Sequence, residues 1–260
     1  MSRFHAALKA FAPAAVLAGC LMAAAPADAT QYFLASNTMD TSRTAHIYGP
    51  NGFDEYTYLA PIRFTAYEGA SAVGESFNFL GFCVDIFHNI GLGALNLAYD
   101  DDYDLTTDSR YTTNTPFSGG TTLTGGQRVQ VARLVNYGTL LYDNAPNTAE
   151  TRDRLAALQG AIWQVINPGY SVVSSSASVN NYIATYSGAN YLTALTGYGS
   201  VGGSINFITE TGKYGIASAH QSFAFQAVPE PATWALMIGG FGAMGAVLRR
   251  SRRLALAPAA

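Results

Sequence analysis

Residues 149–166 read AETRDRLAALQGAIWQVI, and this stretch decides the class of fold. Its apolar residues recur every three or four positions, and the helix-ending tripeptide Asn167-Pro168-Gly169 follows at once. The stretch therefore predicts an amphipathic helix with one face on a core. The apolar set is Leu155, Leu158, Ile162, Val165 and Ile166.

One polar residue interrupts the apolar face of this helix. With about 100° of rotation per residue, Gln159 lies about 40° from Leu155 and inside the arc that also holds Ile162 and Ile166. Burying an amide without partners costs about 1 to 3 kcal/mol. A backbone group or a Tyr hydroxyl that satisfies the amide is the simplest account of Gln159, and a functional role is the alternative.

The sequence on either side of this helix contains both helix and strand patterns. A second amphipathic helix is predicted over Gln127–Tyr142, and residues 171–191 are Ser-rich without a clear pattern. Short strands punctuated by Gly and Pro turns account for the rest. We therefore predict an α+β fold in which an antiparallel sheet packs with a small helical subdomain. The predicted strands include Tyr32–Leu34, Tyr56–Leu59, Ile62–Tyr67, Phe77–Cys83 and two within Ser204–Gln226.

The two ends of the chain have the patterns of processing signals. Arg3 and Lys9 precede an apolar stretch, Phe11–Ala25, and Ala27-Asp28-Ala29 supplies the small residues that a signal peptidase recognises. We predict export and cleavage after Ala29. Leu17-Ala18-Gly19-Cys20 resembles a lipoprotein acylation motif and is kept as an alternative.

At the other end, Pro229-Glu230-Pro231 precedes an apolar run, Ala232–Leu248, that is long enough to span a membrane. A basic cluster follows and is expected to stay cytoplasmic. Motif, apolar run and cluster resemble the PEP-CTERM sorting signal of Gram-negative bacteria, which implies recognition by an exosortase and delivery to the cell surface or the extracellular matrix. A plain single-pass anchor is the alternative. The cluster consists of Arg249, Arg250, Arg252 and Arg253.

These signals divide the chain. We predict a signal peptide over 1–29, an ectodomain over 30–227, a sorting signal with a single transmembrane helix over 228–253, and a tail over 254–260. From Thr30 to Val228 the chain has eight Arg or Lys and fifteen Asp or Glu, so we expect no nucleic acid partner. Tyr99–Asp104 is acidic, but it lacks the spacing of a calcium loop, and we predict a solvated loop without metal.

Cleavage after Ala29 would leave Cys83 as the one remaining cysteine of an exported protein. Strand alternation places it on one face with Phe77 and Phe79, and with Asp85 beyond. An inert buried thiol, an intermolecular partner and a masked reactive group are the three interpretations.

Gly81-Phe82-Cys83-Val84-Asp85 and Leu158-Gln159-Gly160-Ala161-Ile162-Trp163 together resemble the two motifs of the bacterial thioester domain of surface adhesins. The resemblance implies an internal thioester between Cys83 and Gln159 and a covalent bond to an amine-bearing target. Asp85 is a candidate base or orienting group; His88 ranks lower if the strand stays regular. Trp163 is expected to shield the bond from water with Phe77, Phe79 and Phe82.

We therefore expect a covalent adhesin that needs no cofactor and is not an enzyme. Two other functions compete with this hypothesis. A cysteine hydrolase would use Cys83 as nucleophile with His46, His88 or His220 as base, but no His lies in register with Cys83. A structural surface or matrix protein would keep the pair unreacted or use the bond as a staple. Closing so long a loop stabilises a fold by about 4 kcal/mol in the chain-entropy model.

Overall fold

The computed structural model describes residues 30–101, 124–196, 205–210 and 220–226, with positions 240–242, 244 and 249 in helical conformation. The predicted signal peptide, with the alternative at Cys20, and the Pro229-Glu230-Pro231 motif lie outside these residues, as does most of Ala232–Leu248. Among the described residues, no helix is both long enough and apolar enough to cross a membrane.

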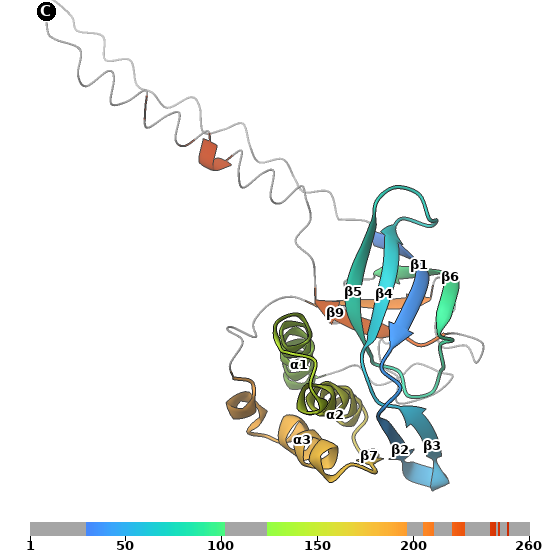
Figure 1. Cartoon of the computed structure of the whole chain (residues 1–260), viewed down its shortest axis with the longest axis vertical. Helices are drawn as coiled ribbons and strands as arrows, with labels where there is room; N and C mark the ends of the chain where they lie inside the picture. Colours follow the sequence, from blue (N-terminus) through green and yellow to red (C-terminus); the bar gives the residue numbers. More distant parts are fainter. Residues whose placement is uncertain are drawn as a thin grey trace, which may run out of the picture.

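Six antiparallel strands close into a barrel (Figure 1). Aromatic rings fill its interior: Phe64 contacts Phe223 and Tyr32 contacts Phe225, although neither pair lies on neighbouring strands. A closed barrel leaves no free sheet edge, and its inward side chains form a packed core. In order around the barrel the strands are β1 (Thr30–Met39), β4 (Ile62–Glu68), β5 (Ser76–Cys83), β9 (Phe223–Gln226), β8 (Ile205–Glu210) and β6 (Gly93–Asp101).

A second antiparallel sheet has the order β3 (Asp54–Tyr58), β2 (Thr44–Tyr48), β7 (Ser171–Ser174). Side chains alternate along β2, where Ala45 and Ile47 are buried and Tyr48 is exposed. Strand alternation of this kind covers one face and leaves the other in solvent. The covered face packs on the helices, since Val172 of β7 contacts Gly160 of the second helix.

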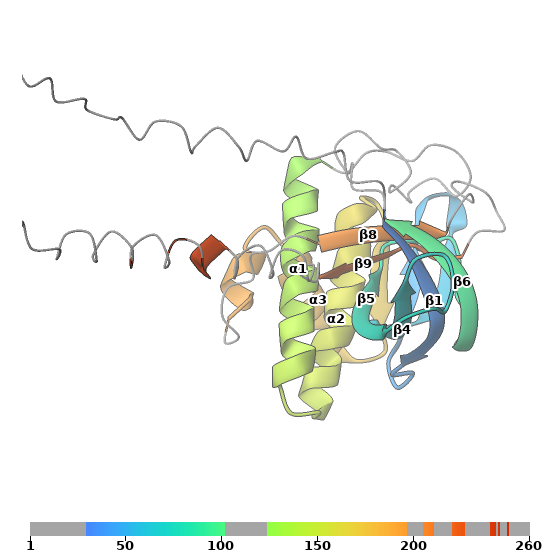
Figure 2. The same cartoon turned by 90° about the horizontal axis from the view of Figure 1, so that it is seen from above.

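Three helices lie beside the barrel (Figure 2). They are α1 (Gly125–Asn144), α2 (Ala149–Ile166) and α3 (Ala177–Ser187), and two short 3-10 turns cover Pro50–Gly52 and Tyr191–Ala194. Side-chain caps begin each helix: Thr124, Thr148 and Ser176 each accept a hydrogen bond from a backbone N–H three residues later.

Two glycines let the helices approach their neighbours. A Cβ at Gly138 of α1 would lie 2.3 Å from the ring of Phe82 on β5, and one at Gly160 of α2 would lie 2.8 Å from Ile183 of α3. Such distances are far inside van der Waals contact, so a larger side chain at either position displaces its neighbour. Because Phe82 and Gly160 adjoin Cys83 and Gln159 in sequence, these contacts set where β5 and α2 meet.

The mixed helix-and-sheet class predicted from the sequence is confirmed. The structure has two antiparallel sheets rather than one, and the larger is closed, because β1 pairs with β6 as well as with β4. The prediction of a solvated loop over Tyr99–Asp104 is wrong for Tyr99–Asp101: these residues pair with both β1 and β8. Residues 102–104 lie outside the described residues.

Candidate functional site

Cys83 is the last residue of β5, and its side chain is only 3% exposed. Two pairings hold this strand end: Cys83 pairs with Phe223 of β9, and the backbone N–H of Val84 donates to the carbonyl of Ser222 at 3.0 Å. The strand stops there, and the chain continues through bends toward β6. The thiol therefore lies at one end of the barrel.

Gln159 reaches this strand end from α2, and it is fully buried. Its Oε1 accepts a hydrogen bond from the backbone N–H of Cys83 at 2.9 Å, and its Nε2 donates to the carbonyl oxygen of Cys83 at 2.7 Å. The amide occupies the position that a neighbouring strand would take. The structure thus brings Cys83 and Gln159 together, and it satisfies the buried amide with the backbone of Cys83 itself.

The thiol of Cys83 donates a hydrogen bond to the backbone carbonyl of Asp85 at 2.9 Å. Burial raises the pKa of this thiol far above its ordinary value, and the charge of Asp85 raises it further; the hydrogen bond to the Asp85 backbone and the indole of Trp163 lower it less. The thiol therefore stays protonated at neutral pH, and thiolate formation has to accompany bond formation.

The carboxylate of Asp85 is committed to the turn that follows β5. Its Oδ1 accepts from the backbone N–H groups of Phe87 and His88, and its Oδ2 pairs with Nδ1 of His88. This differs from the sequence-based ranking, which placed His88 away from Asp85. The ranking assumed a regular strand, whereas β5 ends at Cys83 and the turn brings the ring to the carboxylate. Asp85 contacts the thiol through its backbone.

A cavity of about 330 Å³ opens beside the thiol. Cys83 and Trp163 line it together with Gln221, whose Nε2 donates to the carbonyl of Asp85 at 3.2 Å. Apart from its contact with the Cys83 thiol, the indole N–H of Trp163 has no hydrogen-bond partner within the described part of the chain. None of the described side chains that line this cavity is charged. The others are Met39, Tyr56, Thr57, Tyr58, Ala60, Ile62, Asn89, Ile90 and Leu92.

The predicted shield of four aromatic residues is only partly located here. Trp163 lines the cavity, but Phe79 packs against Phe225 inside the barrel, and Phe77 packs against Tyr32. Phe82 points instead toward Gly138 of α1. The cavity has tyrosines in their place. Sequence reasoning missed Gln221 as well, because its position depends on a strand pairing more than a hundred residues away from Cys83.

The other histidines proposed for a hydrolase have carboxylate partners. His46 contacts Asp54 across β2 and β3, with Nδ1 to Oδ1 at 2.9 Å, and His220 contacts Glu210 at 2.9 Å. Neither hydrogen bond involves the thiol. In the described ranges, no group of three or more His, Cys, Asp or Glu residues has the arrangement of a metal site.

Comparison with known proteins addresses the C-terminus. The model of the PEP-CTERM protein-sorting motif matches residues 227–253. The chain carries a PEP-CTERM sorting motif. The match includes Pro229, Glu230, Pro231 and the four arginines from Arg249 to Arg253, and the motif implies recognition by an exosortase and export through membrane-associated processing to the cell surface. No curated protein and no solved structure shows significant similarity to the chain.

Proposed function

We propose that this exported surface protein is a covalent adhesin, in which Cys83 and Gln159 form an internal thioester that an amine on a surface or matrix component opens. The observation that carries the proposal is the pair of hydrogen bonds between the Gln159 amide and the backbone of Cys83. A buried glutamine amide held against the backbone of an exported cysteine supports formation of this bond, because a fixed neighbour raises the effective concentration of the reacting group. The signal peptide over 1–29 belongs to this proposal.

The bond forms by acyl transfer within the chain. Cys83 Sγ attacks the side-chain carbonyl carbon of Gln159, the thiol proton ends on the departing nitrogen, and ammonia leaves. Negative charge develops on Oε1 of Gln159 during the attack, and the backbone N–H of Cys83 already donates to that oxygen. A preorganised donor of this kind stabilises the tetrahedral intermediate. Before attack the thiol must turn away from the Asp85 carbonyl.

The cavity beside Cys83 offers the path for the second step. A deprotonated amine that enters it attacks the same Gln159 carbon, an amide forms, and the thiol of Cys83 is regenerated. Among the described residues the lining side chains are uncharged, and the reacting groups themselves are shielded, with Cys83 3% exposed and Gln159 fully buried, which supports a setting where water competes poorly. Tyr56 and Tyr58 lie on β3 at the exposed side of this cavity.

A structural surface protein is the second candidate function, and one observation favours it. The two hydrogen bonds with Cys83 give both polar atoms of an intact Gln159 amide a partner, so its burial needs no covalent bond. In that case the pair joins α2 to the barrel end without any reactivity.

Methylamine labelling separates the two functions. The folded, exported protein is incubated with methylamine, digested, and mapped by mass spectrometry. The adhesin predicts methylamide on Gln159 and a newly free Cys83 thiol. Cys83→Ala and Gln159→Ala should each abolish labelling, whereas Gln130→Ala, which removes a half-buried glutamine on α1, should leave it intact. Unlabelled Gln159 in the folded wild-type protein would leave the structural function.

A further inference from the structure

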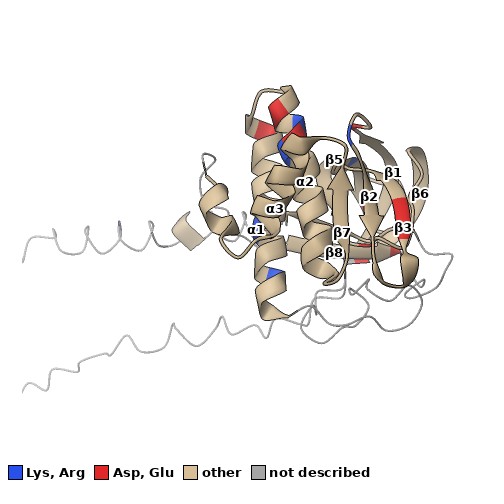
Figure 3. Cartoon of the chain, turned by 90° about the horizontal axis from the view of Figure 1, so that it is seen from below, with Lys and Arg blue, Asp and Glu red and all other residues tan. Residues whose placement is uncertain are grey.

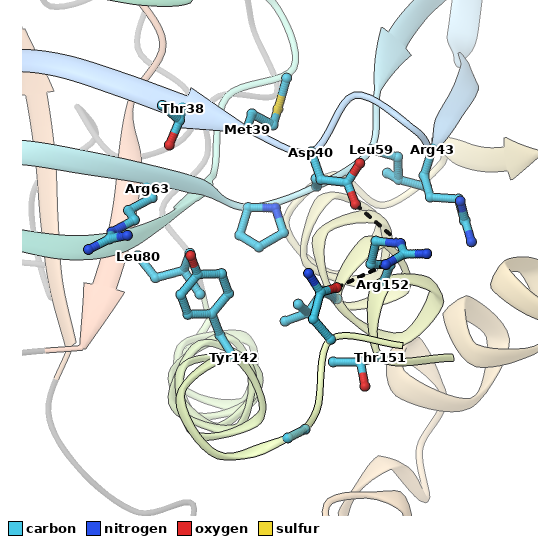
Figure 4. Close-up of a pocket in the computed structure, with 15 residues that line it drawn as sticks. Thr38, Met39, Asp40, Arg43, Leu59, Arg63, Leu80, Tyr142, Thr151 and Arg152 are labelled. Carbon is cyan, nitrogen blue, oxygen red and sulfur yellow. Dashed lines mark hydrogen bonds and ion pairs between the residues drawn. The ribbon is translucent and has the colours of Figure 1, made fainter. Parts of the chain in front are cut away.

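A second cavity, of about 480 Å³, lies between the outer barrel surface and the α1–α2 pair (Figure 4). One wall is a row of neighbours across three strands, since Arg63 of β4 pairs with Thr38 of β1 and with Leu80 of β5. Tyr142 of α1 and Leu155 of α2 face this row from the helices. The cavity therefore combines an apolar surface with polar groups at its rim. Its apolar part is Met39, Leu59, Ala60, Pro61, Leu80, Ala145 and Leu155.

The charge of this cavity is unusual for the domain. The segment from Thr30 to Val228 has nearly twice as many acidic as basic residues, yet three arginines line the cavity. In Figure 3 the charged residues are sparse, and several of both signs gather at one end of α1 and α2. Local arginines in an acidic domain favour an anion at this place over the rest of the surface.

Two of the three arginines already have anionic partners. Arg43 pairs with Asp153 through Nε. The Nε of Arg152 lies 3.7 Å from Oδ2 of Asp40, and its Nη1 donates a hydrogen bond to Oδ1 of Asn147 at 2.9 Å. In Figure 4 the Asp40–Arg152 part of this network occupies one end of the cavity, and Arg63 lies at the other end. Across the described residues, no hydrogen bond or ion pair engages the exposed guanidinium of Arg63.

We infer that this cavity binds a small amphipathic carboxylate, with the carboxylate on Arg63 and the apolar body over Pro61, Leu80 and Leu155. Among the described residues, Arg63 is the one cavity arginine without an anionic partner, which matches one negative charge, and its planar fork fits a carboxylate with two parallel hydrogen bonds. Tyr142 supplies a hydroxyl beside that charge and a ring over the apolar body. The volume is that of an ordinary small-molecule site.

This site is separate from the thiol, although Met39 and Ala60 line both cavities. The inference does not depend on the thioester. Binding should therefore be the same in the wild-type protein and in Cys83→Ala, so failure of the carboxylate site and failure of the adhesin are told apart.

Calorimetric titration of the exported protein with 4-phenylbutyrate tests the site. We expect saturable binding with one ligand per chain, and affinity at least about tenfold lower for 4-phenylbutanamide, the uncharged isostere. D-glucuronate, which has the carboxylate on a polar body, should also bind at least about tenfold more weakly. Equal affinity for the acid and its amide would overturn the inference, as would tighter binding of glucuronate or no saturable binding of 4-phenylbutyrate.

Two variants locate the ligand. Arg63→Gln should weaken 4-phenylbutyrate binding by about tenfold or more, because a charge-assisted pair is lost. Arg133→Gln is the matched control: it removes the same charge from α1, where Arg133 contacts Tyr191 outside the cavity, and should change affinity by less than about twofold. Equal losses in both variants would mean a general charge effect and would overturn the assignment.

Discussion

The two cavities that meet at Met39 and Ala60 differ in chemistry. Among the residues that the structure places, the cavity beside Cys83 is lined by aromatic and amide side chains and by no charged one, whereas its neighbour is lined by Arg43, Arg63 and Arg152. The amide of Gln159 beside Cys83 is satisfied by backbone groups, whereas Arg43 and Arg152 of the arginine-lined cavity have side-chain partners. A reactive bond benefits from the first setting and recognition of a charged group from the second.

This difference shows where the fold accommodates polar and charged side chains. In the interior, the buried amide of Gln159 on α2 is tolerated because its partners, the backbone N–H and C=O of Cys83, are fixed at the end of β5. At the rim, a charged group keeps contact with water and needs no partner, as for Arg63. Loss of a buried polar group should therefore lower the free energy of unfolding far more than loss of an exposed one.

The largest expected effect is at Gln159. Where the thioester has not formed, Gln159→Leu leaves the N–H and C=O of Cys83 buried without their partners, so the free energy of unfolding should fall by about 3 kcal/mol or more; where it has formed, the variant also loses the bond between α2 and β5. Urea denaturation followed by circular dichroism measures it. Gln130→Leu, which removes a half-buried amide bonded to the Tyr186 carbonyl, should cost about 1 kcal/mol. Similar losses in the two variants would contradict the special position of Gln159.

A smaller effect is expected where α1 docks beside both cavities. Gly138→Ala introduces a Cβ against the Phe82 ring and should destabilise the protein by about 1 to 3 kcal/mol, despite the better helix propensity of alanine. Gly126→Ala, in the first turn of the same helix, meets only the Thr124 hydroxyl at 4.0 Å and should be neutral or slightly stabilising. Thermal unfolding of both variants compares them directly; an unaffected Gly138→Ala would mean that α1 docks differently.

The pH dependence of stability distinguishes a free Cys83 from a bonded one. In methylamine-treated protein the buried thiol has a raised pKa, so its contribution to stability is complete below the unfolded pKa of about 8.5. As pH rises above that value, the unfolded chain releases the proton first, and stability should fall by up to about 1.4 kcal/mol per pH unit.

Cys83→Ala is the reference for this titration, since it retains the tyrosines that also titrate at alkaline pH, Tyr99 and Tyr186. The treated wild-type protein should lose stability relative to the variant between pH 8 and 10. Parallel curves for the two proteins would show that the thiol is not held in the apolar setting described.

The smallest effect is expected at the outer cavity. Arg63→Gln should change the free energy of unfolding by less than about 0.5 kcal/mol, because the side chain is exposed and its loss strands no buried partner. Chemical denaturation is the measurement. A loss approaching that of Gln159→Leu would make Arg63 a structural residue and remove the contrast between the two cavities.

Local signals predicted the helices well. The bounds of α2 match the sequence-based range, because Asn167-Pro168-Gly169 cannot continue a helix. The first helix extends two residues further at each end than predicted, since the capping box of Thr124 and Gln127 was overlooked. For α3, Ser176 with Val179, Ile183 and Tyr186 at helical spacing was a signal that could have been used.

Pairings between distant segments were not predictable in the same way. Closure of the barrel depends on β1 meeting β6, and the site depends on β9 meeting the end of β5. No local pattern of one sequence encodes such partners. The pair Cys83 and Gln159 was identified through a resemblance in two motifs, whereas the contact of Asp85 with His88 required knowing that the strand stops at Cys83.

The most direct test of the central claim is the intact mass of the freshly purified, folded and untreated exported protein, measured together with its free thiol content after denaturation at low pH. The account predicts a mass lower than that of the processed sequence by one ammonia, with no free thiol. The same measurement on Gln159→Ala should give the full sequence mass and one thiol. Full sequence mass with a free Cys83 in the wild-type protein would contradict the thioester.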